Sequence, residues 1–350
     1  MKARTFVIAV GGFAASALAG AGCGSDSAPP KSPEDQALAQ VKSYITTNLD
    51  VLVTSTTQIR DTAPAPDADG WNATADAAAV TSMRTSWRAA RAAYEHIEGA
   101  IAVLFPDLDV STDERYDAFL EMAPDSYLFD DQGVTGVHAI ERILWSDSIR
   151  PEVVAFESKL TGYQAAAFPA SAQEADDFKN KLCARLVTDV TTMRSMFTPL
   201  GLDPGAAYRG VIGSIGEQVE KVEKASTGEE ESRYANETLA DMRSNLAGGV
   251  ATVDAFKALL TSKAGGSDLD ARIHAGLQRL QDAYDKFPGA AIPAPPADWS
   301  SNNPSDADLA TDFGQLYTTV KKESDQVSQD STAGLMTNAA SLMGIPVLPQ

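Results

Sequence analysis

Residues 133–145 read GVTGVHAIERILW and predict a short helix that is entered through two glycines. His138 and Glu141 lie three residues apart, so a helix presents both side chains on one face, one turn apart. An imidazole and a carboxylate in this arrangement form half of a metal site. The alternative is a histidine at the edge of the core that hydrogen-bonds to the neighbouring carboxylate. The spacing alone leaves both interpretations open.

The same spacing occurs once more, in a helix predicted for about residues 74–104. Glu95 and Glu98 would share a face of this helix, whereas His96 points about 100° away from Glu95 on an ideal helix. Two helices that each offer two ligands would close a site of one histidine and several carboxylates. Such a site suits iron, or zinc or copper through the imidazole. The alternative is a solvated charged face, on which Arg91 pairs with Glu95 at i, i+4.

An acidic connection follows this helix. Its aspartates are Asp107, Asp109, Asp113, Asp117, Asp125, Asp130 and Asp131. Acids on a loop after a proline are usually solvated turn residues. One of them could supply a further oxygen ligand, and the spacing does not select which one.

The rest of the chain is also predicted to be helical, because alanine is abundant, β-branched residues are sparse and no alternating strand pattern of useful length occurs. Ser32-Pro33-Glu34-Asp35 is a strong helix start, with a cap, a proline at the first position and acids in the first turn. Glycines in the segment 210–216 indicate close helix packing. Other helices are expected at about 113–122, 149–168, 171–197, 206–225, 230–262, 267–287, from 305 onward, and at 333–343.

The predicted fold class is therefore all-α, as two antiparallel helical-bundle halves of about 33–200 and 201–345. The turn that begins at Gly201 is the natural seam between them. Glutamates in the segment 228–234 are most simply explained as an acidic first turn of the 230–262 helix, where they complement the helix dipole.

Composition limits the class of partner. The hydrophobic fraction of 44% is enough for a real core in a chain of 350 residues. The formal net charge is -20, and a surface of this charge repels nucleic acid and attracts cations.

The N-terminus predicts export. Residues 1–22 combine a basic start with a short apolar run, as in a secretory signal peptide. Small residues precede Cys23, which predicts a bacterial lipoprotein with an acylated Cys23 and a tether over 23–32. Gly24 after the cysteine favours the outer membrane. Cys183 would then be a small buried hydrophobe rather than half of a disulfide.

Together these residues resemble a known family. The blocks that carry the resemblance are Trp87-Arg88, 94–99, 105–109, 113–117 and above all Gly136-Val137-His138-Ala139-Ile140-Glu141. They are similar to the imelysin family, and within it to the EfeO branch of bacterial iron-uptake proteins. The resemblance covers about residues 35–285.

The resemblance implies an exported all-α protein with a metal site. His138, Glu141, Glu95 and Glu98 would be its ligands, together with an acid of the 107–113 segment, Asp113 or Asp109. The longer members carry an N-terminal cupredoxin domain, which we expect to be missing here. The family has been labelled peptidase, but the sequence has no His-Glu-x-x-His motif and only three histidines.

The sequence therefore predicts a lipid-anchored periplasmic protein that binds iron, as Fe²⁺ or Fe³⁺, and hands it to a membrane permease or stores it transiently. Zinc or copper are the alternative metals. The rival functions are a zinc-dependent metallopeptidase and a module that binds a polysaccharide or another ligand. An aromatic content of 7% gives the polysaccharide module little support.

Overall fold

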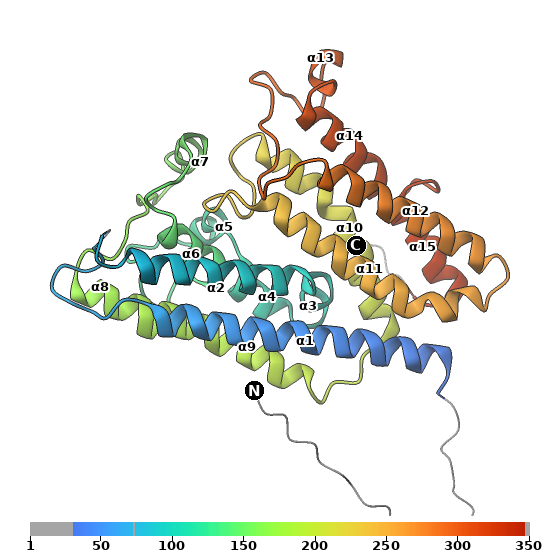
Figure 1. Cartoon of the computed structure of the whole chain (residues 1–350), viewed down its shortest axis with the longest axis horizontal. Helices are drawn as coiled ribbons and strands as arrows, with labels where there is room; N and C mark the ends of the chain where they lie inside the picture. Colours follow the sequence, from blue (N-terminus) through green and yellow to red (C-terminus); the bar gives the residue numbers. More distant parts are fainter. Residues whose placement is uncertain (1–30, 73, 347–350) are drawn as a thin grey trace, which may run out of the picture. The chain divides into compact units, whose positions relative to one another are not determined.

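The computed structural model describes residues 31–72 and 74–346, and every regular element in these ranges is a helix (Figure 1). The predicted all-α fold class is thus confirmed. The predicted signal peptide, Cys23 and nearly all of the tether lie outside the described residues. Within the described part of the chain, no helix is both long enough and apolar enough to cross a membrane.

The helices before the seam at Gly201 are α1 (Pro33–Thr62), α2 (Ala77–Glu95), α3 (Glu98–Leu104), α4 (Pro106–Asp113), α5 (Tyr116–Met122), α6 (Gly136–Leu144), α7 (Pro151–Glu157), α8 (Ala172–Asp177) and α9 (Cys183–Phe197). A π-helical turn, Phe178–Leu182, joins the last two. After the seam come α10 (Pro204–Ala225), α11 (Thr238–Thr261), α12 (Gly266–Asp285), α13 (Asp306–Leu309), α14 (Asp312–Ser324) and α15 (Thr332–Met343).

Sequence signals at the helix ends work as predicted. The side chain of Ser32 accepts a hydrogen bond from the backbone N–H of Asp35, and the Asp35 carboxylate accepts one from the backbone N–H of Ser32. Pro33 takes the first helical position of α1, where its missing N–H costs nothing. Ser171 caps α8 in the same way, by accepting from Glu174. Cys183 is buried, as predicted.

Long-range packing joins helices from both sides of the seam. In Figure 1, α1 runs beside α2 and α9, and α11 also packs against α1. On the other side, α10 packs against α11 and α14, and α12 against α15. The short helix α3 packs on α10. The division into two halves therefore stays a prediction, since the helices on either side of Gly201 share one continuous set of contacts.

The helix predicted over 74–104 is wrong in one respect, because it is broken between α2 and α3. Asn245 of α11 explains the break. Its side-chain amide donates to the carbonyl oxygen of Glu95 at 2.8 Å and to the carboxylate of Glu98 at 2.8 Å. A partner from a distant helix thus satisfies a carbonyl that would otherwise require the helix to continue.

Two other predicted helices are shorter in the structure. The helix expected over 149–168 ends at Glu157, and further along the segment the backbone N–H of Gln164 donates to the hydroxyl of Tyr116 instead of to a helical carbonyl. The helix expected over 230–262 begins only at Thr238, and residues 230–237 form turns. Short interruptions also divide the regions 113–122 and 305–324, whereas the helix predicted over 171–197 continues without a gap through the π-helical turn.

Close helix packing in the glycine-rich segment is confirmed. Gly210 of α10 faces Gly99 of α3, and a Cβ at either position would collide with the other residue's carbonyl oxygen. We predict that Gly210→Ala lowers the free energy of unfolding by about 1–3 kcal/mol, because α3 and α10 must then separate. Urea denaturation measures the loss. Gly201→Ala is the control, since no described atom lies within 4 Å of a Cβ there. An equal change in both variants would contradict the packing argument.

A second prediction concerns pH. His274 of α12 lies 2.9 Å from the carboxylate of Asp254 and 3.3 Å from that of Asp270. Partial burial lowers its pKa, but the hydrogen bonds to the carboxylate of Asp254 and to the backbone carbonyl of Asp270, together with the charges of both aspartates, outweigh burial and raise it overall. A raised pKa in the folded protein stabilises it below the unfolded pKa, and the gain disappears as pH rises through the folded pKa. His274→Gln should therefore lower the free energy of unfolding by at most about 1 kcal/mol at pH 5.5 and by less at pH 8.5. The reverse order in urea titrations would refute this.

Candidate metal centre

The helix that carries His138 is placed by its first residue. Gly136 begins α6 with φ at +85°, and a Cβ there would lie 2.7 Å from the carbonyl oxygen of Thr112. Only glycine combines this backbone conformation with such a close approach. The contact sets α6 against the end of α4, where Asp113 is the last residue. As a result, Nε2 of His138 lies 3.5 Å from Oδ1 of Asp113.

Hydrogen bonds fix the orientation of the His138 ring. Nδ1 of His138 lies 2.7 Å from Oε2 of Glu141, and Oε1 of Glu141 accepts the backbone N–H groups of Tyr234 at 3.0 Å and Ala235 at 2.8 Å. Burial raises the pKa of Glu141, and the hydrogen bond from the backbone N–H of Ala235 opposes this shift. In its ionised form the carboxylate only accepts hydrogen bonds, which places the proton on Nδ1 and leaves a lone pair on Nε2. The arrangement is typical of metal-binding histidines, which donate their second ring nitrogen to a carboxylate.

The lone pair on Nε2 has no partner. His138 is 1% exposed, and its Nε2 receives no hydrogen bond from any described residue. Burial, reinforced by the positive charge of Arg91, lowers the pKa of His138 well below its usual value, so the ring is neutral. Two unprotonated acceptors, Nε2 and the carboxylate of Asp113, facing each other at 3.5 Å are unfavourable, and a proton on Asp113 or a cation between them would satisfy both.

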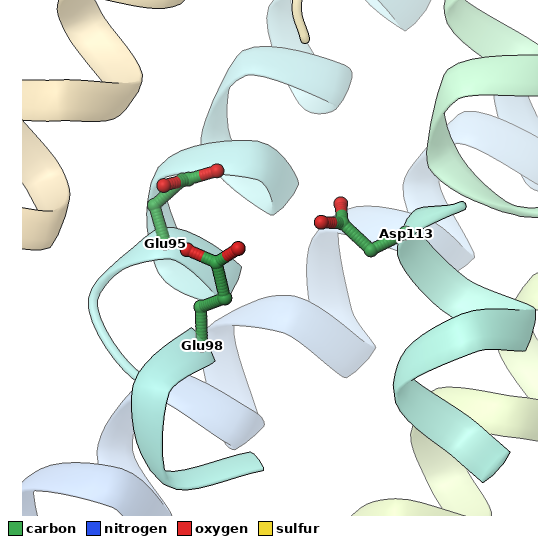
Figure 2. Close-up of side chains that lie close together, drawn as sticks. All are labelled: Glu95, Glu98 and Asp113. Carbon is green, nitrogen blue, oxygen red and sulfur yellow. The ribbon is translucent and has the colours of Figure 1, made fainter. Parts of the chain in front are cut away.

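Three helix ends bring carboxylates together, and one of these carboxylates, that of Asp113, lies beside this histidine. Glu95 is the last residue of α2, Glu98 the first of α3 and Asp113 the last of α4, and Figure 2 shows their carboxylates directed toward one another. Each offers an oxygen within 4.8 Å of the other two. Glu95 belongs to a second such group, with Glu231 and Asp241.

Two basic side chains lie inside this acid cluster, which we define as Glu95, Glu98, Asp113, Glu231 and Asp241. Arg91 is ion-paired to Glu95 and Asp113, and its guanidinium is 2.9 Å from Glu231 and 3.5 Å from Asp241. Lys221 reaches in from α10. Its Nζ is 2.6 Å from Glu231, 3.1 Å from Glu95 and 3.5 Å from Glu98.

The acid cluster holds more acids than cations, because its five acidic side chains are ion-paired with only these two basic side chains in the described part of the chain. Burial raises the pKa of Glu95, Asp113 and Asp241, despite the nearby basic side chains. In Glu231 the balance is opposite, since the charges of Lys221 and Arg91 overcome burial and hold its pKa at about 2. Buried carboxylates in excess of their cations are costly, and a bound metal ion would neutralise them.

A cleft of about 160 Å³ leads to the acid cluster. It is lined by Glu98, Asp109, Val110, Asp113, Glu114, Arg115 and Glu231. Asp109 accepts a hydrogen bond from the hydroxyl of Tyr94, and burial raises its pKa to about 6. Five of the seven residues that line the cleft are acidic, against one basic residue, Arg115, and this balance suits the approach of a cation.

The structure brings some of the predicted residues together and separates others. Glu95, Glu98 and Asp113 meet directly, and Asp109 lies in the cleft beside them. Both oxygens of Glu141 are already engaged, so it lies behind His138 rather than in the acid cluster, and its role as a ligand stays a prediction. His96 packs against the ring of Tyr44, with centroids 6.1 Å apart, and does not face the cluster.

One alternative and one prediction for the charged segments are wrong. The Arg91–Glu95 pair exists, but both side chains are buried, so this face is not solvated. The segment that carries Glu231 is not a helical turn complementing a dipole, since it folds into the cluster as part of the 230–237 turns. Sequence reasoning missed Lys221 and Asp241, although one pattern could have found them. Each lies among the buried positions of its helix, where a charged side chain needs a partner.

Fold and site together define a class: an all-helical protein with a candidate carboxylate and histidine metal centre at the meeting point of several helix ends. The chain belongs to the imelysin family. The family model described as Imelysin (Peptidase_M75) matches residues 45–331. The family resemblance found from the motifs is thereby confirmed.

Similar proteins agree with this assignment. The chain is 24% identical over 251 residues to proteins named "Iron uptake system component EfeO" from Escherichia coli (strain K12) and Shigella flexneri. The match covers 72% of this chain and 53% of each relative, so the chain spans about half the length of these curated relatives. The crystal structure of an imelysin-like protein from Psychrobacter arcticum 273-4 shares the fold. Its TM-score is 0.59 at 11% identity, and the match covers 91% of this chain and 99% of that one.

Proposed function

We propose that this protein captures iron outside the cytoplasm and passes it to a membrane permease. The observation that carries the proposal is the pairing of an unpartnered, neutral His138 Nε2 with a carboxylate-rich cluster at the end of an acidic cleft. The names of the relatives support iron as the cargo. Export, acylation of Cys23 and periplasmic location belong to the same proposal, and loss of fatty-acid labelling in Cys23→Ser would support the anchor.

The donor set suits iron. Carboxylate oxygens bind hard cations, and one imidazole favours a transition metal over Ca²⁺ or Mg²⁺. We assign Nε2 of His138 and the carboxylates of Glu95, Glu98 and Asp113 as ligands, with Asp109 on the path of entry. Glu141 would hold the imidazole in the required tautomer. Capture and release of an ion require no bond-making chemistry.

Metal binding by Asp113→Asn tests this function. Purified wild-type protein would be analysed for bound metal and titrated with Fe²⁺ without oxygen, with Fe³⁺ citrate, Zn²⁺ and Cu²⁺. We expect stoichiometric iron in the wild type and a loss of about tenfold or more in Asp113→Asn. Asp107→Asn is the control, because this residue is on the same helix but exposed.

Two results would reject the proposal. Equal iron affinity in wild type and Asp113→Asn would mean that iron binds elsewhere. Absence of iron binding in both proteins would reject the proposed iron-capture function. Tight zinc binding accompanied by casein hydrolysis would instead favour the metallopeptidase that the family description names.

A further inference from the structure

We propose that the ammonium group of Lys221 takes the place of the metal ion in the metal-free protein and is displaced from the site when a metal ion binds. This inference rests on the proposed function and concerns the regulation of the same site. Lys221 is buried, with 3% exposure, and every ion pair of its ammonium is with a carboxylate of the acid cluster.

The position of the ammonium makes it a direct competitor. Nζ lies 3.1 Å from Glu95 and 3.5 Å from Glu98, two of the carboxylates assigned to the metal. A metal ion held by those oxygens would sit about 2.0–2.2 Å from them. It would therefore be a near neighbour of the ammonium in a buried environment, where repulsion between like charges is strong. The metal ion and the ammonium group therefore cannot occupy these positions at the same time.

Lys221 is better suited to leave than Arg91. The Arg91 guanidinium is held at several nitrogens by four carboxylates, including Asp113 and Asp241 on either side. A lysine has one compact charge on a flexible stem, so it changes position with less loss of hydrogen bonding. The cluster thus contains one cation that anchors it and one that is exchangeable.

A second cleft offers the ammonium a place to go. About 210 Å³ in volume, it is lined by Arg115, Glu217, Glu220, Lys221, Lys224 and Glu231, and it shares Arg115 and Glu231 with the acidic cleft. Glu217 lies one turn before Lys221 on α10. Burial and the charge of Glu98 raise the pKa of Glu217 to about 7, although the charge of Lys221 already lowers it in part. Lys221 would gain this partner when it leaves Glu95.

The exchange would serve a carrier. In the metal-free protein the ammonium limits repulsion among the carboxylates and keeps the site assembled. In the loaded protein the same group stands ready to return, which weakens binding and favours release. A storage site would have no use for an internal competitor.

The first test compares Lys221→Met with wild type and with Lys224→Met. Lys224 lines the second cleft and pairs with Glu220, outside the acid cluster. Calorimetric titration with Zn²⁺ and with Fe²⁺ should show binding about tenfold or more tighter in Lys221→Met, and unchanged affinity in Lys224→Met. Metal should also raise the Tm of Lys221→Met more than that of wild type.

Equal or weaker binding in Lys221→Met overturns the inference and leaves the proposed function intact, provided that wild type binds metal. Absence of binding in both proteins overturns both proposals. Binding by Lys221→Met alone supports the competition, because it shows the site to be blocked by the ammonium.

A second measurement uses the wild-type protein and does not depend on the variant folding. Brief treatment with acetic anhydride, followed by mass spectrometry, reports the accessibility of each lysine. We expect Lys221 to be unreactive without metal and several-fold more reactive with saturating Zn²⁺, while Lys224 stays the same. Equal protection of Lys221 in both states, when calorimetry shows metal to be bound, would overturn the displacement.

Discussion

Replacing Arg233 with methionine is expected to lower the free energy of unfolding by about 3–5 kcal/mol. Arg233 is fully buried and is ion-paired to Asp117, and its Nε lies 3.6 Å from Glu157. Its guanidinium also lies 5.5 Å from the ring centroid of Phe156. Methionine keeps the apolar contacts but removes the main cation of Asp117, which then has only Arg115 at 3.9 Å, and one of the two arginines beside Glu157, which keeps Arg142. A buried charge that loses its partner is far more costly than a lost surface pair.

Urea denaturation followed by circular dichroism measures the change. The control is Arg60→Met, because Arg60 pairs with Asp61 at the surface and should contribute no more than about 1 kcal/mol. Similar small losses in the two variants would mean that water or rearranged side chains solvate Asp117 and Glu157 in the variant.

The expected effect is large because Arg233 holds the segment that completes the metal centre. Residues 230–237 contribute Glu231 to the acid cluster, and Arg233 and its two following residues tie them to the first part of the chain. Arg233 binds Asp117, the Tyr234 hydroxyl donates to Glu157, and the backbone N–H groups of Tyr234 and Ala235 donate to Glu141. Loss of one tie should loosen the segment, so Arg233→Met should also weaken metal binding.

Local signals were sufficient for the fold class. The cap at Ser32, the proline after it and the helical spacing of apolar residues all act within a few positions of the chain. The breaks inside predicted helices have a different origin. Asn245 ends α2 through a bond to a residue 150 positions earlier, and Glu141 holds the turn before α11 from 94 positions away. Such partners have no trace in local composition.

The candidate site divides in the same way. Two pairs separated by three residues, His138 with Glu141 and Glu95 with Glu98, were visible because their spacing is local. Spacing did not reveal that Glu141 turns its oxygens toward His138 and the backbone, nor that Lys221 enters the cluster from α10. Those features depend on which helices meet, and α3 meets α10 through the contact between two glycines.

The second large effect concerns the histidine itself. His138→Ala is expected to lower affinity for Fe²⁺ and Zn²⁺ by at least about 100-fold, while Glu141→Gln lowers it by about 10–100-fold. Alanine removes the nitrogen donor. Glutamine keeps the size of Glu141 but weakens the acceptor that holds the proton on Nδ1, so the ring is less well oriented. Helicity should be unchanged in both variants.

His274→Ala is the matched control for this pair. It removes another histidine that hydrogen-bonds to acids, but one at the surface between α11 and α12, and it should leave metal affinity unchanged. Calorimetric titration separates three readings. A loss confined to His138→Ala, with Glu141→Gln near wild type, would make Glu141 dispensable for orientation. A loss in both variants supports His138 as a ligand and Glu141 as the residue that orients it. Unchanged affinity in both variants would mean that the pair is structural, a buried histidine hydrogen-bonded to its neighbour. The carboxylates alone would then bind the metal.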